Sequence, residues 1–216
     1  MINFFHQLHV RALLILSPAA FFFKINSLDW YRETLHEWAD DNKRNTRLHI
    51  LELACETGSL SGYLHKQGHK IIGVDLSPSM IKQAKANHPK IDFYEADASN
   101  LPFKDNEFDC VLVASLINIA PSAEKIIAEM ARVCKKGGLI KILVPAKNFD
   151  DQKLETLVEE LAIKGFSKAA LRTWHQKPPK MSLSDIDTLL KTSNLVADSH
   201  RYHLNEMLLS LTILND

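Results

Sequence analysis

Two apolar runs in the first half of the chain each contain a carboxylate, one inside its run and the other at the end of its run. Carboxylates in these places suit a ligand that carries a ribose. Residues 49–58 begin as an apolar run containing Glu52 and end in the small residues of a turn at Gly58. A second apolar run, residues 70–75, closes with Asp75. An acid at the end of the second strand of a strand–helix–strand unit accepts hydrogen bonds from both ribose hydroxyls. An ordinary unit with two solvated carboxylates has the same pattern, so this stretch alone leaves both interpretations open.

Apolar runs alternate with helical patterns through the middle of the chain. Helices are predicted over residues 59–67, from Ser77-Pro78 to about Asn87, and from Ser122 to about Cys134. Further strands are predicted over residues 91–95, 109–114 and 139–144. Five strands that alternate with helices indicate a parallel sheet with helices on both faces.

The pattern changes after Pro145. We expect a helix over residues 150–163, an irregular stretch over 165–180 and a helix over 184–193, capped by Ser182 or Ser184. Residues 196–203 and 207–214 alternate well enough to form two strands of an antiparallel hairpin, with a turn at 204–206. The predicted fold class is therefore α/β: a doubly wound, mostly parallel seven-stranded sheet with a C-terminal antiparallel hairpin and helices on both faces.

The chain of 216 residues is long enough for one sizeable core and contains no internal repeat or linker. We expect a single domain over residues 1–216. Its parts are an N-terminal helical arm (1–46), a core (47–145), a variable cap (146–182), and a last helix with the hairpin (183–216).

Composition excludes some classes of function. Lys+Arg and Asp+Glu number 26 each, so no global field favours nucleic acid or an acidic partner. Cys55, Cys110 and Cys134 are widely spaced in or beside apolar runs, which is typical of core residues in a reducing, cytoplasmic compartment. The ten histidines show no clear ligand spacing, so no metal site is predicted.

The first 23 residues are apolar, with Arg11 as their only formal charge. The densest part, residues 12–23, is shorter than the roughly 18 to 20 residues of a spanning helix, and Pro18 interrupts it. We expect a helical arm that covers the ligand site or packs on the domain. A membrane-surface anchor is the alternative. A helix over residues 27–42 follows, with Ser27 as its N-cap.

Four blocks in order resemble the class I S-adenosylmethionine-dependent methyltransferases, in particular the small-molecule branch that includes quinone-biosynthesis enzymes. The blocks are residues 50–58 (ILELACETG), residues 73–80 (GVDLSPSM), Asp97 with residues 101–109 (LPFKDNEFD), and residues 129–138 (EMARVCKKGG). The resemblance covers about residues 50–145. It implies a Rossmann-like methyltransferase fold, S-adenosyl-L-methionine as the cofactor and a small-molecule methyl acceptor.

The resemblance also implies roles for particular residues. Glu52 would help to position the methionine end of the cofactor, and Gly58 would let the backbone approach it. Asp75 would bind the ribose hydroxyls, with Leu76 and Met80 against the adenine. A methionine on a helix is also a common core residue, so Met80 has that second interpretation.

Three further positions follow from the same resemblance. Asp97 would accept a hydrogen bond from the adenine amino group, with the Ala98 amide nearby. Ser115 would border the transferred methyl group, or would simply end its strand.

Ala54 and Glu56 occupy positions in the turn where the family usually has glycines. Glutamate at this place requires an unstrained backbone, whereas glycine could adopt a positive φ. Its carboxylate would face the cofactor carboxylate, pair with the cofactor ammonium group or turn to solvent. Like charges about 4 Å apart cost roughly 4 kcal/mol at an effective dielectric constant near 20.

Two functions from different classes remain open. The first is methyl transfer to a small organic acceptor. The second is a catalytically inactive, methyltransferase-like binding or scaffold protein, which Glu56 would favour. A nicotinamide dehydrogenase fits less well, because Gly-x-Gly-x-x-Gly is absent.

The catalytic residues are not assigned by the sequence. A general base is needed only if the acceptor arrives protonated. His175, His200 and His203 are the candidates in the C-terminal third, and each is better explained as a surface histidine.

Overall fold

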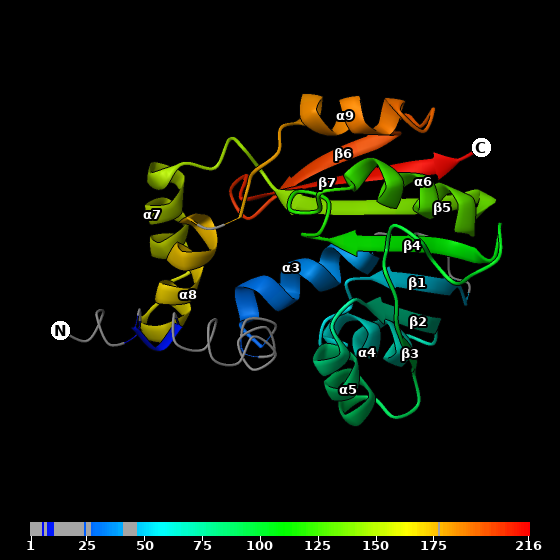
Figure 1. Ribbon diagram of the computed structural model, residues 1–216. Helices are drawn as coiled ribbons and strands as arrows, with labels where there is room; N and C mark the ends of the chain where they lie inside the picture. Colours follow the sequence, from blue (N-terminus) through cyan, green and yellow to red (C-terminus); the bar gives the residue numbers. More distant parts are fainter. Residues whose placement is uncertain (1–5, 7, 11–23, 25–26, 41–46, 177) are drawn as a thin grey trace.

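A computed structural model describes residues 6, 8–10, 24, 27–40, 47–176 and 178–216 of the chain. Its centre is a seven-stranded sheet in the order β3-β2-β1-β4-β5-β7-β6 (Figure 1). The strands are β1 (His49–Leu53), β2 (Lys70–Asp75), β3 (Asp92–Glu95), β4 (Phe108–Ala114), β5 (Cys134–Pro145), β6 (Ser199–His203) and β7 (Leu208–Asn215). The first five strands are parallel, and β7 runs antiparallel between β5 and β6. The predicted fold class is confirmed.

Strand β1 is the place where the direction of winding changes. It pairs in parallel with β2 on one side and with β4 on the other. Loops that leave β1 and β4 therefore diverge to opposite faces of the sheet and open a crevice at the carboxyl ends of the strands. That edge is where the acids predicted to bind a ligand end their strands.

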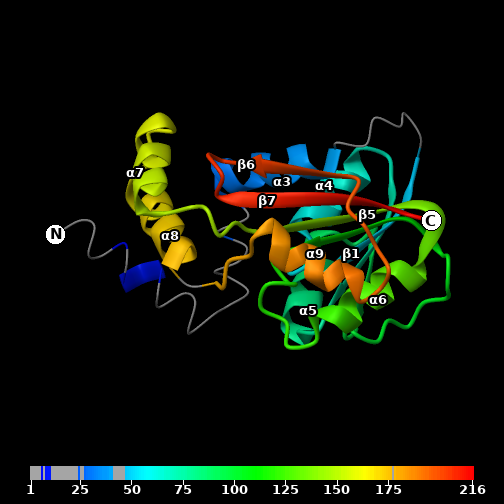
Figure 2. The same cartoon turned by 90° about the horizontal axis from the view of Figure 1, so that it is seen from above.

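Helices cover both faces of the sheet. One face carries α3 (Asp29–Asp40), α4 (Ser59–Lys66) and α5 (Pro78–Asn87), and the other carries α6 (Ala123–Val133) and α9 (Leu183–Lys191). Figure 2 shows α3 and α4 opposite α6 and α9 across the strands. The alternation of strand side chains produces this division: Cys110 and Leu112 of β4 pack towards α3 and α4, and Val111 and Val113 pack towards α6.

Helix ends follow the chemistry of their first residues. The Ser77 hydroxyl accepts a hydrogen bond from the Met80 amide, and Pro78 occupies the first turn of α5, as the sequence predicted. Ser182 and Asp185 form a reciprocal capping box at the start of α9. Ser182 is therefore the N-cap among the two predicted candidates.

The prediction of an irregular stretch over residues 165–180 is wrong for most of that range. Helix α7 (Asp151–Glu160) is followed by a second helix, α8 (Gly165–Gln176). Gly165, at φ +57°, reverses the chain between the two helices, and Ala169, Ala170 and Leu171 are buried. The pair stands beyond the carboxyl ends of the strands, as Figure 1 shows, and forms the cap.

Strand β5 begins earlier than predicted. The strand was predicted over residues 139–144, but β5 starts at Cys134, directly after α6 ends at Val133. The register against β4 shifts between Phe108, opposite Cys134, and Cys110, opposite Leu139. Gly137 has φ +71°, so Gly137 and Gly138 form an irregularity within the strand.

The apolar N-terminal segment lies mostly outside the described residues. Residues 6 and 8–10 are helical, and the expected arm or membrane-surface anchor over the rest of residues 1–23 remains a prediction. No helix in the described part of the chain is long and apolar enough to cross a bilayer.

Candidate cofactor site

A pocket of about 360 Å³ opens at the carboxyl ends of the parallel strands. We call it the edge pocket. Its walls come from the loops after β1, β2, β3 and β4 and from the start of α6, and its lining residues are Ala54, Val74, Asp75, Leu76, Ala96, Asp97, Ala98, Ser99, Leu116, Ile119, Ala120, Pro121, Ser122 and Ile126. This volume lies in the range of small-molecule sites.

Asp75 is held in the edge pocket by two backbone amides. Its Oδ2 accepts a 3.0 Å hydrogen bond from the Glu56 amide, and its Oδ1 accepts a 2.9 Å bond from the Ser77 amide. A carboxylate offers about four lone-pair sites. One site on each oxygen therefore remains for a ligand, which suits two adjacent hydroxyl groups.

Asp97 and Ala98 form the neighbouring wall. Oδ1 of Asp97 accepts hydrogen bonds from the amide and the hydroxyl of Ser99, each 2.8 Å long. These bonds lower the pKa of the exposed Asp97 carboxyl below its usual range. The residue is therefore an ionised acceptor at neutral pH, at the rim of the pocket.

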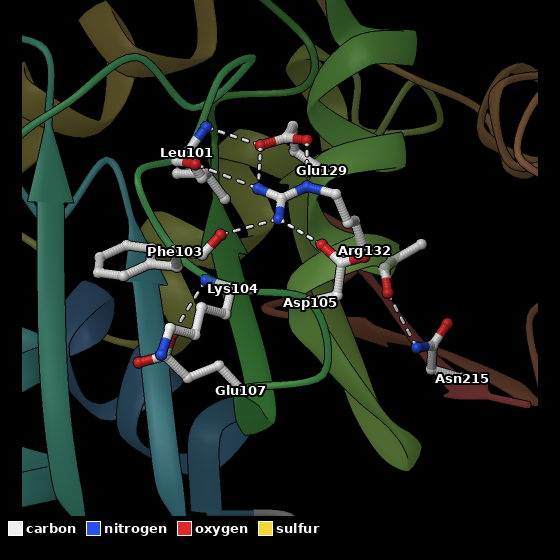
Figure 3. Close-up of polar contacts among 9 residues, drawn as sticks. Leu101, Phe103, Lys104, Asp105, Glu107, Glu129, Arg132 and Asn215 are labelled. Carbon is white, nitrogen blue, oxygen red and sulfur yellow. Dashed lines mark hydrogen bonds and ion pairs between the residues drawn. The ribbon is translucent and has the colours of Figure 1, made fainter.

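The loop that follows this wall is fastened to α6 by one arginine. The Arg132 guanidinium donates to the Leu101 and Phe103 carbonyls at 3.1 and 2.8 Å, and to Asp105 at 2.8 Å (Figure 3). Glu129 pairs with Arg132 at 2.7 Å and accepts a 2.6 Å bond from the Leu101 amide. Residues 101–109 and 129–138, the last two blocks of the sequence resemblance, are thus joined by one polar network. This network fixes the loop behind Asp97.

A second, nearly filled cavity of about 20 Å³ lies beside the edge pocket and shares Ala54 with it. We call it the inner pocket. It is lined by Tyr31, Leu35, Glu52, Ala54, Cys55, Glu56, Ser59, Leu60 and Ala114. Neither pocket is lined by a lysine or arginine of the described residues, and the inner pocket holds two carboxylates. Its charge suits a cationic group.

Glu52 is a buried carboxyl in the inner pocket, and its pKa is strongly shifted. The side chain is 7% exposed and accepts a short hydrogen bond from the Ser61 hydroxyl. Burial raises its pKa to about 8, with a further contribution from the charge of Glu56. Burial also raises the pKa of Tyr31 beyond its usual range, and the charge of Glu56 acts in the same direction. Tyr31 is therefore a neutral phenol at physiological pH.

The turn after β1 is strained, contrary to the expectation of an unstrained backbone at Glu56. Ala54 has φ +52° and Glu56 has φ +50°, so both adopt the left-handed conformation that glycine adopts most readily. Ser115, after β4, has φ +54°. Such strain persists where surrounding contacts fix the backbone, and it concentrates at functional sites.

Gly58 and Met80 line neither pocket. Gly58 has φ +78°, and a Cβ there would lie 2.7 Å from the Phe93 ring, so packing against Phe93 also requires glycine. Met80 is 6% exposed in the first turns of α5. Ser115 also lies outside the two linings, and its buried hydroxyl has no hydrogen-bond partner among the described residues.

None of the three candidate histidine bases lines either pocket in the described part of the chain. His175 Nε2 lies 3.0 Å from Asp151, and its Nδ1 lies 3.1 Å from Lys180 Nζ. His203 Nε2 lies 2.8 Å from the Ser210 hydroxyl, and His200 is exposed on β6.

Sequence reasoning missed Tyr31 and Arg132 as parts of this region. Tyr31 belongs to the helical pattern that also contains Leu35 and Trp38, which indicated only a buried helix face. Arg132 lay within a matching block, but nothing in the sequence identified its partners. Spacing along one element cannot reveal a contact with a distant loop.

The central part of the chain matches a known family. The family model for a methyltransferase domain matches residues 51–142. A demethylmenaquinone methyltransferase from Renibacterium salmoninarum is 37% identical over 93 residues, which are 43% of this chain and 39% of that protein. A phosphatidylethanolamine N-methyltransferase from Cereibacter sphaeroides is 32% identical over 119 residues, 49% of this chain and 58% of that protein. The match thus spans less than two thirds of either relative.

Solved structures share the fold over nearly the whole chain. A protein from Pyrococcus horikoshii superposes with a TM-score of 0.66 at 20% identity and covers 89% of this chain and 93% of its own. A possible histamine N-methyltransferase from Thermotoga maritima has a TM-score of 0.66 at 17% identity, covering 97% of this chain and all of its own. At these identities the likeness shows the fold.

Proposed function

We propose that residues 51–142 form a methyltransferase domain of the class I, S-adenosylmethionine-dependent type, and that the protein methylates a small organic acceptor. The observation that carries the proposal is the Asp75 carboxylate. Two backbone amides hold it in the edge pocket, and each of its oxygens keeps one acceptor site for a ribose hydroxyl.

The residues present fit the two ends of the cofactor. Asp75 binds the ribose, Asp97 accepts from the adenine amino group, and Leu76 and Ile119 enclose the base in the edge pocket. Glu52 and Glu56 in the inner pocket face the positive charges at the methionine end. Met80 supports the base from α5, Gly58 holds the turn, and the Ala98 amide lies beside Asp97.

The bound cofactor supplies a methyl group that is already activated by its sulfonium. The chain's own contribution is then alignment of the acceptor and exclusion of water. Tyr31 and Leu35 exclude water at the inner pocket, and Ser115 borders the point of transfer. The cap formed by α7 and α8 closes the same edge of the sheet. The proposal leaves the catalytic base unassigned.

Three further parts of the proposal rest on less specific observations. The acceptor is a small molecule, as the names of the relatives suggest for those proteins. Cys55, Cys110 and Cys134 are free and buried, which supports a reducing, cytoplasmic location. A membrane contact through residues 1–23 is the alternative role for the apolar segment.

Calorimetry with S-adenosylmethionine and S-adenosylhomocysteine tests the proposal. We expect micromolar binding of both, and a loss of at least tenfold in the Asp75→Asn variant. The control is Asp92→Asn, which changes an exposed acid on β3. Absence of binding at millimolar cofactor in the native protein would overturn the enzyme proposal in favour of a binding or scaffold protein.

A further inference from the structure

A lysine side chain is buried in the middle of the sheet. Lys141 lies on β5 with 1% of its surface exposed, between Ile140 and Ile142, which are buried on the opposite face. Burying an ammonium group is costly unless polar groups replace the lost water. The ammonium group must therefore have polar partners that offset the cost of its burial.

The partners of Lys141 belong to the end of α3. Its Nζ donates to the Trp38 carbonyl at 2.5 Å and to the Ala39 carbonyl at 3.4 Å. It also lies 5.9 Å from the centre of the Trp38 ring. The last carbonyls of a helix lack partners within the helix and carry partial negative charge, so a cation stabilises them. A strand residue thus caps a helix that lies about a hundred positions earlier in the chain.

The same helix forms one wall of the inner pocket. Tyr31, Leu35 and Trp38 are spaced four and three residues apart, so they share the face of α3 that packs on the sheet. Trp38 lies at the end held by Lys141, and Tyr31 and Leu35 lie two turns and one turn earlier, in the lining of the inner pocket. A shift of the capped end along the helix axis would move Tyr31 by a similar amount.

At its other end, α3 is held from the cap. Trp30 Nε1 donates a 2.8 Å hydrogen bond to the Ser167 hydroxyl of α8. That contact involves the cap, whereas Lys141 belongs to the sheet that also carries Glu52. Among the described residues, two polar contacts join α3 to the sheet: the exposed ion pair between Glu37 and Arg201 of β6, 2.8 Å long, and the buried bond from Lys141. Lys141 is the one that is shielded from water, so it is the firmer link between Tyr31 and the sheet.

We propose that Lys141 is a positioning residue for the methionine end of the cofactor site, acting through the capped end of α3 on Tyr31 and Leu35. This inference rests on the proposed function, because it assigns the inner pocket to the methionine end. It does not extend to the edge pocket, whose described lining contains no residue of α3. Lys141 should therefore affect ligands that enter the inner pocket and leave a bare nucleoside unaffected.

The test compares two ligands in the full chain. Lys141→Met replaces the ammonium by an apolar group of similar length, and such replacements of buried charges are often tolerated by the fold. We expect the affinity for S-adenosylhomocysteine to fall about tenfold or more by calorimetry, while the affinity for adenosine changes less than twofold. The control is Lys135→Met, another lysine of β5, which pairs with Asp109 at 2.7 Å and lines neither pocket. The control should bind both ligands as the native protein does.

A purely structural role would lower both affinities together, and that result, or equal binding of S-adenosylhomocysteine, would overturn the inference. If Lys141→Met does not fold, Lys141→Gln replaces it. The glutamine side chain keeps a neutral donor but is one bond shorter. The test is again whether the affinity for S-adenosylhomocysteine falls while the affinity for adenosine does not. Native protein that binds neither ligand would instead contradict the proposed function, so the two failures are distinguishable.

Discussion

The backbone amide of Glu56 donates a 3.0 Å hydrogen bond to Oδ2 of Asp75, which joins the turn after β1 to the end of β2. Asp75 therefore has two tasks: it orders this turn, and it presents its remaining lone pairs to the edge pocket. Because of this link, substitution of the Asp75 side chain should change both folding and binding.

Asp75→Ala removes the acceptor of two backbone amides and of the expected ribose hydroxyls. We expect roughly 2 to 4 kcal/mol of cofactor affinity to be lost, since hydrogen bonds to charged groups are each worth about 1.5–3 kcal/mol. Urea unfolding should show a loss of about 1–3 kcal/mol, because two amides lose their partner. Unaltered binding would remove Asp75 from the site.

Glu56→Gly should affect stability and binding in opposite directions. The left-handed conformation costs a residue with a side chain about 1–2 kcal/mol, so glycine should raise the free energy of unfolding by up to about 1 kcal/mol. We expect weaker cofactor binding, because the carboxylate lines the inner pocket, where we propose that the methionine end binds and its ammonium group can pair with Glu56. Glu56→Gln separates the two effects, since it keeps the strained backbone and loses the charge. Tighter binding in both variants would mean that Glu56 repels the cofactor carboxylate.

Glu52 should make stability depend on pH. Its pKa is about 8 in the folded protein, above the ordinary 4.5, so the folded state holds a proton that the unfolded chain releases. Between about pH 4.5 and 8 the free energy of unfolding should therefore decrease as the pH rises, and it should level off above pH 8. Glu52→Gln should lose this slope, whereas Glu95→Gln, an exposed residue on β3, should keep it. Parallel pH profiles for Glu52→Gln and the native protein would contradict the assignment.

The same group should couple cofactor binding to proton release. A cation in the inner pocket favours the ionised Glu52, so affinity for S-adenosylmethionine should increase with pH up to about 8. Calorimetry at pH 7 in two buffers of different ionisation enthalpy measures the proton directly. For Glu52→Gln, the binding enthalpy should be the same in both buffers, because this side chain releases no proton.

Arg132→Met should loosen the loop behind Asp97. The guanidinium holds the Leu101 and Phe103 carbonyls, and it is only 31% exposed. We expect a loss of about 1–3 kcal/mol in unfolding free energy and weaker binding of adenosine. Arg172→Met is a matched control, because Arg172 is also 31% exposed and pairs with one carboxylate, Glu155, away from the pockets. Equal adenosine affinity in Arg132→Met and Arg172→Met would mean that the loop held by Arg132 does not contribute to the binding site.

His175 should make the base of the cap sensitive to acid. Burial and the neighbouring Lys180 lower its pKa below the ordinary 6.5, so the folded protein resists a proton that the unfolded chain accepts. The free energy of unfolding should therefore fall as the pH drops below about 6.5. His175→Gln, which does not titrate, should lose less stability between pH 7 and pH 5 than the native protein. His200→Gln, on the exposed face of β6, should behave as the native protein does.

Local signals in the sequence predicted most elements of the fold. Period-two and helical patterns placed the strands and the helices around them, and Ser77-Pro78 and Ser182 marked helix starts that the structure contains. The two acids predicted to bind the nucleoside, Asp75 and Asp97, line one pocket with Leu76, Ala98 and Ala54. Such features depend on residues close together in sequence.

Features that depend on distant residues were not predicted. Lys141 gains its role from Trp38, about a hundred positions away, and Tyr31 from the loops after β1 and β4. The backbone at Glu56 was predicted wrongly because its cost is borne elsewhere, by bonds such as the one to Asp75. Helix α8 was missed because Gly165 and the nearby Pro178 looked like loop signals, whereas its buried face packs in a core that the sequence alone does not reveal.

The place of β7 in the sheet has a consequence for synthesis on the ribosome. This strand lies between β5 and β6 and pairs along eight residues of β5, while the Asn215 amide donates to the Ala131 and Cys134 carbonyls. Until residues 208–215 leave the exit tunnel, β5 presents an unpaired apolar edge to other nascent chains. The emerging polypeptide should therefore need chaperone protection until these residues have emerged and β7 has paired with β5.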